Sequence, residues 1–164
     1  MKVNHTYLPV LQWACRTHRP VRILEWGPGR STEEMLRLCP NAHILSIEHD
    51  KRWYERWRLA LDVNGRLELT LLNHTLSPAR DTGYATYPLR HSKGGFDLVF
   101  VDGRSRCDCL VVARLALRPK GIVILHDSER KAYREGVDYF EWHRDVPGLR
   151  TMVLSTAPTE IPTF

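Results

Sequence analysis

The chain has 164 residues, of which 43% are hydrophobic and 26% are charged, a balance that is ordinary for one soluble globular domain. No apolar run approaches the roughly 18 residues that a membrane-spanning helix needs, and no secretory signal follows Met1. We therefore expect a cytoplasmic protein with no membrane partner. The net charge of +5 comes mostly from arginines that are spread along the chain among acidic residues, which favours solvated helix faces over a nucleic-acid surface.

The four cysteines predict reduced thiols rather than a metal site. Zinc sites usually combine two cysteine clusters, or one cluster with histidines at set spacing, and the sequence has neither pattern. We interpret the cysteines mainly as packing residues.

The first predicted element is a helix over residues 7–18, within an N-terminal segment that spans residues 1–20. An apolar strand at 21–24 follows, and Gly27-Pro28-Gly29 breaks it sharply. Ser31, with Glu34 three residues later, has the spacing of a capping box, so a second helix is expected to begin there.

The next strand, residues 44–47, ends in Glu48, about 20 residues after the glycine turn. Glycines let a ligand approach the backbone, a helix start offers unpaired N–H groups, and an acidic strand end can accept both hydroxyls of a ribose. The stretch therefore predicts a nucleoside-containing ligand at the carboxyl ends of a parallel sheet. An NAD-dependent oxidoreductase is the less favoured alternative, because Thr32 stands where the dinucleotide motif has its third glycine.

A helix capped by Asp50 is expected to run to about residue 62, with its aromatic residues in the core, and a third strand follows at 67–72. Residues 76–95 are rich in glycine, proline and serine and have no amphipathic period. A connection of this length beside the strand ends predicts a lid or substrate wall, with Tyr84, Tyr87 and His91 on the acceptor side.

The rest of the chain continues the alternation of strands and helices. Buried strands at 96–101 and 122–125 end in Asp102 and in His126-Asp127, helices are expected at 110–117 and 128–143, and a sixth strand at 149–154. The pattern predicts one α/β domain with a doubly wound, mostly parallel Rossmann-like sheet of six or seven strands and helices on both faces. A seventh strand is expected only from the last few residues.

Four segments together resemble one branch of the class I S-adenosylmethionine (SAM) methyltransferases. They are ILEWGPGRST, ILSIEHDKRWYERW, FDLVFVDGRSR and LRPKGIVILHDSERKAYREG, which carry W-G-x-G-x-S-T, E-H-D-x-x-W-Y and D-G-R-x-R motifs in order over about residues 20–136. The resemblance implies a Rossmann-like fold, SAM as cofactor and S-adenosylhomocysteine (SAH) as product. The methyl acceptor stays open, since most of this branch has no assigned acceptor. Two motifs of base methylation, N-P-P-[YF] and P-C, are missing.

The resemblance also implies a set of cofactor-binding residues, which are, in chain order, Glu25, Gly27, Gly29, Ser31, Thr32, Glu48, His49, Asn73, His74 and Asp102. Glu25, Gly27 and Gly29 would line the methionine end of SAM, with Ser31 and Thr32 at the start of the helix. Glu48 would hold the ribose hydroxyls, and the next three would lie near the adenine. Asp102 would sit beside the methyl group and the acceptor.

Asp102, His126 and Asp127 are the candidate catalytic residues, because they follow adjacent strands and could converge at one point. Methyl transfer from a sulfonium is an in-line displacement, so positioning supplies much of the acceleration. An oxygen acceptor also needs its proton removed, and histidine exchanges protons near neutral pH, so His126 is the predicted general base. A SAM-binding protein without catalysis is the alternative.

The metal-dependent alternative is a catechol-type O-methyltransferase, whose metal-binding Asp, Asp and Asn correspond to Asp102, Asp127 and Ser128. Mg²⁺ prefers hard oxygen ligands, but a serine in place of the amide weakens the match, so no metal ligand is predicted. Arg104 and Arg106 could instead bind an anionic small-molecule acceptor. Assembly as a homodimer is left open.

Overall fold

The computed structural model describes residues 5–61, 65–72, 83–91 and 94–164. The strands, in chain order, are β1 (Arg22–Trp26), β2 (His43–Glu48), β3 (Leu67–Leu71), β4 (Phe96–Val101), β5 (Leu117–His126), β6 (Trp142–Val146) and β7 (Thr151–Ser155). The helices are α1 (Leu8–His18), α2 (Arg30–Leu38), α3 (Lys51–Ala60), α4 (Tyr87–His91), α5 (Arg106–Ala116) and α6 (Arg134–Val137), with a 3₁₀ turn η1 (Lys131–Tyr133) before α6. None of the described helices has the length and apolar character to cross a membrane.

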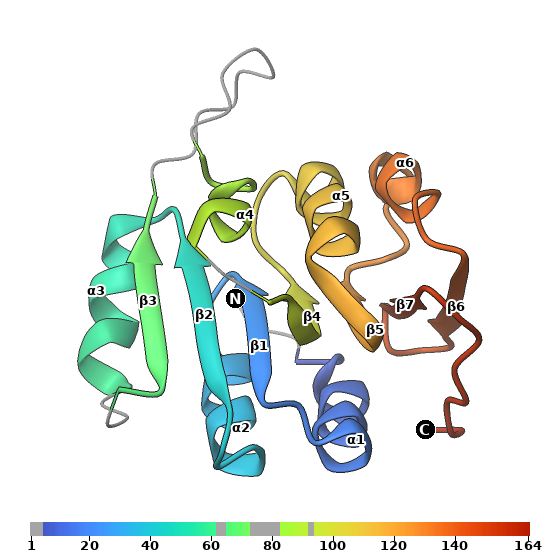
Figure 1. Ribbon diagram of the computed structural model, residues 1–164, viewed down its shortest axis with the longest axis horizontal. Helices are drawn as coiled ribbons and strands as arrows, with labels where there is room; N and C mark the ends of the chain where they lie inside the picture. Colours follow the sequence, from blue (N-terminus) through green and yellow to red (C-terminus); the bar gives the residue numbers. More distant parts are fainter. Residues whose placement is uncertain (1–4, 62–64, 73–82, 92–93) are drawn as a thin grey trace.

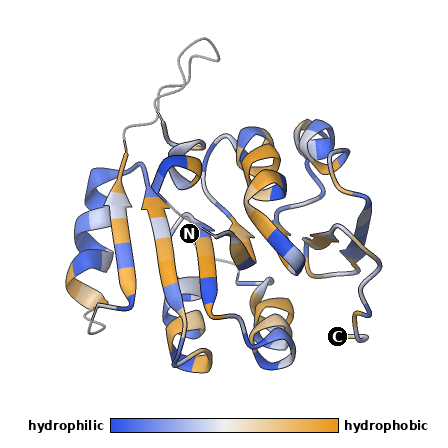
Figure 2. Ribbon diagram, in the orientation of Figure 1, coloured by the Kyte–Doolittle hydropathy of each residue, from blue (hydrophilic) through white to orange (hydrophobic). Residues whose placement is uncertain are grey.

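The seven strands within the described residues form one sheet in the order β3-β2-β1-β4-β5-β7-β6 (Figure 1). The five strands from β3 to β5 are parallel, whereas β7 runs antiparallel to both β5 and β6. The expected doubly wound, mostly parallel α/β sheet is confirmed, with seven strands. Figure 2 shows apolar residues concentrated in the central strands, as expected for a sheet that helices cover on both faces.

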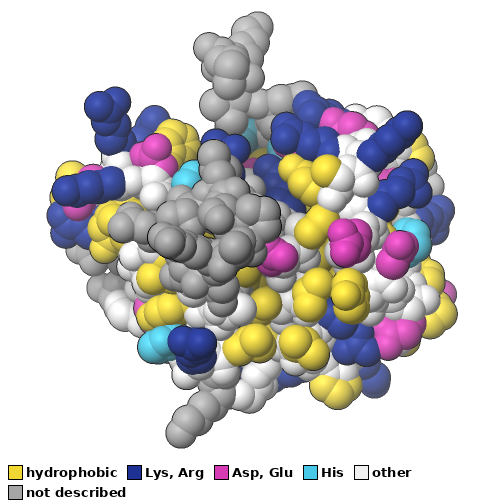
Figure 3. Space-filling model, turned by 90° about the horizontal axis from the view of Figure 1, so that it is seen from above, with side chains coloured by type: hydrophobic (Ala, Val, Ile, Leu, Met, Phe, Trp, Pro, Cys, Tyr) yellow, Lys and Arg dark blue, Asp and Glu magenta, His cyan; other side chains and the backbone are white. Residues whose placement is uncertain are grey.

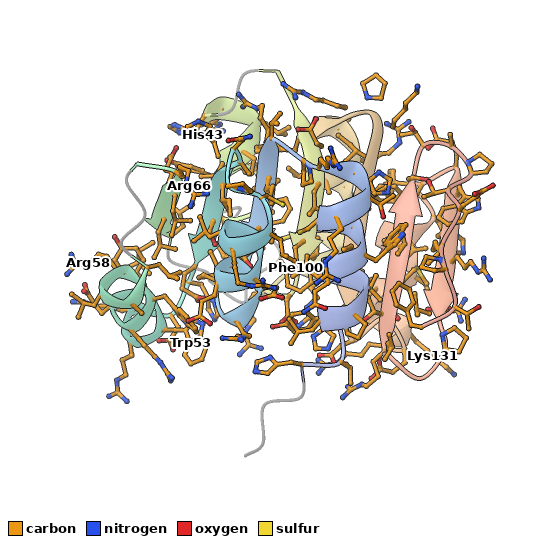
Figure 4. The ribbon with its side chains drawn as sticks, turned by 90° about the horizontal axis from the view of Figure 1, so that it is seen from below. His43, Trp53, Arg58, Arg66, Phe100 and Lys131 are labelled. Atoms are coloured by element: carbon orange, nitrogen blue, oxygen red, sulfur yellow. The ribbon has the colours of Figure 1, made fainter. Side chains whose placement is uncertain are left out.

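Alternate residues of each central strand enter one of two cores. In β4, Leu98 and Phe100 pack with apolar residues of α1 and α2 on one face, while Val99 and Val101 pack with α5 and α6 on the other. Figure 4 shows α1 and α2 side by side over the first face, with Phe100 between them. Because both faces are covered, the carboxyl ends of the parallel strands are left as the natural place for a ligand.

The C-terminal part differs from the expectation. A single helix over 128–143 was expected, but the structure has only η1 and the short α6, and residues 142–146 form β6. Together with β7 this strand makes an antiparallel hairpin, in whose turn Gly148 has a φ of +77°. The expectation that a seventh strand needs the last few residues was therefore wrong. Residues 143–145 at the exposed edge are charged or polar, which hides the strand pattern in the sequence.

The segment from 76 to 95 is not irregular throughout. Residues 87–91 form α4, and Tyr84 is only 1% exposed and belongs to the core on the α5 face. The Tyr84 side chain therefore packs inside the domain and does not form an acceptor-facing wall. Residues 73–82 and 92–93 lie outside the described residues, so the lid role of the segment stays a prediction.

Candidate active site

The carboxyl ends of β1, β2, β4 and β5 meet at one edge of the sheet, which we call the carboxyl edge. Glu48, Asp102 and His126 all lie at or directly after these strand ends. Figure 3 looks onto this side of the molecule and shows lysine and arginine side chains on both sides of it. The structure thus brings together the sequence-predicted residues that follow the strands.

Glu25 of β1 is fully buried and holds the start of α2 in place. Its carboxylate accepts hydrogen bonds from the hydroxyls of Ser31 (2.5 Å), Thr32 (2.6 Å) and Ser46 (2.7 Å). Burial raises the pKa of Glu25 to about 7, although the three hydroxyl donors oppose that shift. The predicted residues Glu25, Ser31 and Thr32 therefore contact one another as a support beneath the glycine turn.

The helix start uses a different cap from the one that the sequence predicted. Gly29 is the N-cap of α2, and its backbone N–H donates to the hydroxyl of Thr32 at 2.9 Å. The Ser31–Glu34 capping box was wrong, because the Ser31 hydroxyl is taken by the buried carboxylate and Glu34 pairs with Arg37 at 2.7 Å. A cap can be reciprocated from the third helical position by a threonine as well as by an acidic residue.

The two glycines of the turn have different constraints. Gly27 has a φ of +92°, and a Cβ there would lie 3.0 Å from backbone atoms of Asp102 and Gly103, so the fold itself requires glycine. Gly29 has extended backbone, and a Cβ there would meet no described atom closer than 3.9 Å. The fold therefore does not require glycine at position 29, which is consistent with close approach of a ligand.

Glu48 lies at the end of β2 and is only 2% exposed. Its Oε1 atom accepts hydrogen bonds from the backbone N–H groups of His49 (2.6 Å) and Asp50 (2.7 Å) and lies 2.7 Å from Nδ1 of His49. The other ring nitrogen of His49 lies 3.3 Å from Nε of Arg104. All three contacts fall on Oε1, so the described residues leave Oε2 available to a ligand hydroxyl.

The predicted pair Asp102 and His126 is formed. Nδ1 of His126 lies 3.0 Å from Oδ1 of Asp102, and Nε2 lies 3.2 Å from the hydroxyl of Thr6. His126 is 7% exposed, and the ring of Tyr7 packs edge-on against it with 4.9 Å between ring centroids. Sequence reasoning missed the two N-terminal residues, since nothing local indicates that a chain start will cover a strand end more than 100 residues away.

Arg106 differs from its predicted role as a contact for an anionic acceptor, because its side chain is buried and bound within the protein. It is 9% exposed, and its Nε donates to the carbonyl of Gly103 at 3.0 Å. Its terminal nitrogens donate to the carbonyl of His126 (2.5 Å) and to both the carbonyl (2.9 Å) and the carboxylate (2.8 Å) of Asp102. Arg106 therefore ties the ends of β4 and β5 together and does not face an anionic acceptor, whereas Arg104 is exposed.

The carboxylate of Asp127 is surrounded by three arginine side chains. Its carboxylate lies 2.7 Å from Arg150, 3.3 Å from Arg130 and 3.6 Å from Arg106. The residue itself has a φ of +54°, so the chain turns sharply after β5. With three cationic neighbours, Asp127 serves to balance charge at this corner, and its predicted catalytic role stays a prediction.

The donor set does not suit a magnesium ion. Ligand atoms of Asp102, His126 and Asp127 lie within 4.8 Å of one another, but guanidinium groups already occupy both carboxylates. Ser128, the expected third oxygen ligand, instead donates to Asp145 at 3.1 Å. These residues therefore favour an arrangement in which arginine, not metal, supplies the positive charge.

Two of the predicted cofactor residues, Asn73 and His74, lie outside the described residues. The remaining ones fall into two groups at the carboxyl edge. The glycine turn with its support and Asp102 form one group, and the end of β2 forms the other.

No protein-family model matches the sequence, and no curated protein matches it. Among solved structures, a methyltransferase-like protein from Silicibacter pomeroyi aligns at 20% identity over 99% of this chain and 90% of that chain, with a TM-score of 0.69. An O-methyltransferase from Bacillus cereus in complex with SAH aligns at 15% identity over 94% of this chain and 82% of that chain, with a TM-score of 0.71. The chain shares the Rossmann-like fold of these methyltransferase structures.

At these identities the likeness shows the fold alone. A spermidine synthase from Thermotoga maritima also aligns, at 18% identity over 95% of this chain and 60% of that chain, with a TM-score of 0.66. The same fold therefore occurs in an enzyme that is not called a methyltransferase. The antiparallel β7 between β5 and β6 departs from the parallel 3-2-1-4-5-6 order of dinucleotide-binding domains. That difference, together with Thr32, disfavours the NAD alternative.

Proposed function

We propose that this protein is a SAM-dependent methyltransferase that methylates a hydroxyl oxygen of a small acceptor. The observation that carries the proposal is the Asp102–His126 pair at the carboxyl edge, in which the second ring nitrogen of His126, Nε2, contacts a hydroxyl, that of Thr6. The methyltransferase fold supports it, because several neighbours with this fold are O-methyltransferases.

The cofactor half of the proposal rests on the two groups at the carboxyl edge. Glu48 would accept the ribose hydroxyls through Oε2, because its other oxygen is already bound by backbone N–H groups. The turn at Gly27 and Gly29 would receive the methionine end next to Asp102, whose backbone lies directly against Gly27. Bound SAM would supply a sulfonium methyl group there and leave as SAH.

The acceptor half rests on His126. An ionised carboxylate can only accept a hydrogen bond, so Asp102 fixes the ring with its proton on Nδ1 and the lone pair on Nε2. Nε2 would then take the proton of the acceptor hydroxyl as the oxygen attacks the methyl carbon. The Thr6 hydroxyl at 3.2 Å marks the distance at which an acceptor hydroxyl would sit.

The polarity of the acceptor is a further part of the proposal. Arg106 is fully engaged by backbone and carboxylate oxygens, whereas Arg104 is exposed and reaches His49 at the same edge. We therefore assign Arg104 as the contact for an anionic group on the acceptor, such as a carboxylate.

The test uses SAM labelled in its methyl group and a panel of phenolic and hydroxy acids, with thermal denaturation in SAH as the binding readout. Wild-type protein should transfer label and should melt at a higher temperature in SAH, by mass action. His126→Gln should lose transfer but keep the SAH shift, and the matched control His43→Gln, at the opposite end of the strands, should keep both.

The outcomes separate the parts of the proposal. Absence of an SAH shift in wild type would refute the cofactor assignment. Normal transfer by His126→Gln would refute the general-base role alone, while binding without transfer to any acceptor would favour the non-catalytic alternative.

A further inference from the structure

The indole N–H of Trp57 is a buried donor that has no acceptor among the described residues. Trp57 lies on α3 and is only 8% exposed, and no described residue accepts a hydrogen bond from its Nε1 atom. Leaving such a group unsatisfied is unfavourable, so native proteins rarely keep one without a reason. A buried unpaired donor beside a ligand site indicates a partner that arrives with the ligand.

The position of the indole points to the glycine turn. A Cβ built on Gly29 would lie 3.9 Å from Cζ2 of Trp57, and Cζ2 is bonded to the ring carbon that carries Nε1. The Cζ2 atom of the neighbouring Trp53 lies 4.0 Å from the same point, but Nε1 of Trp53 donates to the carbonyl of Pro28 at 2.6 Å. Both tryptophans therefore lie against Gly29 and against each other, with 5.9 Å between their ring centroids, but only the Trp53 donor has an acceptor among the described residues.

The electrostatics at this point favour a negatively charged partner. α2 starts directly after Gly29, and the first turn of a helix carries partial positive charge from its N–H groups. The guanidinium of Arg56 lies over both indole rings, 5.1 Å from the centroid of Trp53 and 5.8 Å from that of Trp57. The unpaired donor, the helix start and the arginine all favour an anionic oxygen.

We propose that the Trp57 indole N–H binds the α-carboxylate at the amino-acid end of SAM, against Gly29 and the start of α2. The inference rests on the proposed function, because it names a contact within the same cofactor site. It explains why glycine stands at position 29 although the fold does not require it: a side chain there would lie against the indole and take the place of the bound carboxylate.

The experiment compares two tryptophan variants and two ligands. Trp57→Phe removes the unpaired N–H and keeps an aromatic ring, while the matched control Trp53→Phe removes an N–H that is bonded within the protein. SAH carries the amino-acid end, and 5′-methylthioadenosine has the same nucleoside without it. Calorimetric titration measures affinity, and thermal denaturation without ligand measures stability.

Trp57→Phe should weaken SAH binding about 10- to 100-fold, as expected for a hydrogen bond to a charged group, and leave 5′-methylthioadenosine binding unchanged. Without ligand its melting temperature should be equal to or above that of wild type. Trp53→Phe should melt lower but keep the wild-type ratio of the two affinities.

Three results would overturn the inference. Unchanged SAH affinity in Trp57→Phe would remove the contact while leaving the proposed function intact. Equal weakening of both ligands would show general damage to the site rather than loss of a carboxylate contact. If wild type binds neither ligand, the proposed function fails together with the inference, and this result is distinct from the first two.

Discussion

The buried carboxyl of Glu25 should make the stability of this protein depend on pH in a direction opposite to that of most acidic residues. Its pKa is raised from 4.5 to about 7 by burial, so the folded state binds a proton that the unfolded chain has released between these values. Its contribution to stability is therefore fully present below about pH 4.5 and is lost as the pH rises through 7. Glu25→Gln stays neutral throughout and should lack this loss.

The size of the effect follows from the shift. Each pKa unit corresponds to about 1.4 kcal/mol, so wild type should lose roughly 2.5 kcal/mol relative to Glu25→Gln between pH 5 and pH 8. For a domain of this length that amounts to a difference of about 5–10 °C in melting temperature. Part of the constant offset between the two proteins will come from the hydrogen bonds that an amide makes with Ser31, Thr32 and Ser46.

The assay is thermal denaturation of both proteins in buffers from pH 5 to pH 8, analysed as the difference in melting temperature at each pH. Glu33→Gln, which removes a carboxylate from the outer face of the same helix, corrects for the change in net charge. Parallel curves for wild type and Glu25→Gln would refute the reasoning, because they would mean that Glu25 is ionised in the folded state at all of these pH values.

Three further predictions concern the turn, the strand ends and metal. Gly27→Ala should lower the melting temperature by several degrees, because the alanine would have a left-handed backbone conformation and its Cβ would press against backbone atoms. Gly29→Ala should melt like wild type without ligand but lose most of its stabilisation by SAH. Equal melting temperatures of the two variants without ligand would contradict this. Arg106→Lys should cost about 2–4 kcal/mol in urea denaturation because lysine cannot reproduce the fork, while the exposed Arg104→Lys should cost less than about 0.5 kcal/mol. Methyl transfer should persist in excess EDTA, and a loss that added Mg²⁺ restores would contradict the assignment of arginines as the partners of Asp102 and Asp127.

Much of the sheet and the ends of its strands could be predicted from the sequence. The runs before Asp102 and His126 are continuously apolar, the run before Glu48 is interrupted only by Ser46, and all three end abruptly in polar residues, which is the pattern of a buried parallel strand. Because parallel strands place their carboxyl ends at one edge, the order of these residues along the chain was enough to bring them together.

The features that were missed depend on contacts between distant segments. Arg106 donates to backbone carbonyls that come together only when β4 and β5 lie side by side. Its position in the sequence is therefore indistinguishable from that of an exposed arginine at a helix start. Thr6 and Tyr7 reach His126 only because α1 packs across the sheet. Tyr84 lies in a segment of glycine, proline and polar residues, and it becomes part of the core only because the folded chain packs it with residues of the sheet and of α5.

The antiparallel hairpin of β6 and β7 covers the edge of β5, and it is the last part of the sheet to be synthesised. Until residues 151–155 pair with β5, the apolar stretch 122–125 is a bare sheet edge, and it is synthesised about 25 residues before its cover. Exposed apolar edges pair readily with other chains, so this intermediate is the stage most prone to aggregation during synthesis. In the folded protein the edge strand on this side of the sheet is instead β6, whose exposed residues 143–145 include an arginine and an aspartate. A chain truncated before β6 should therefore accumulate as insoluble protein rather than fold as a shorter soluble domain, even though all of the predicted cofactor-binding and catalytic residues would still be present.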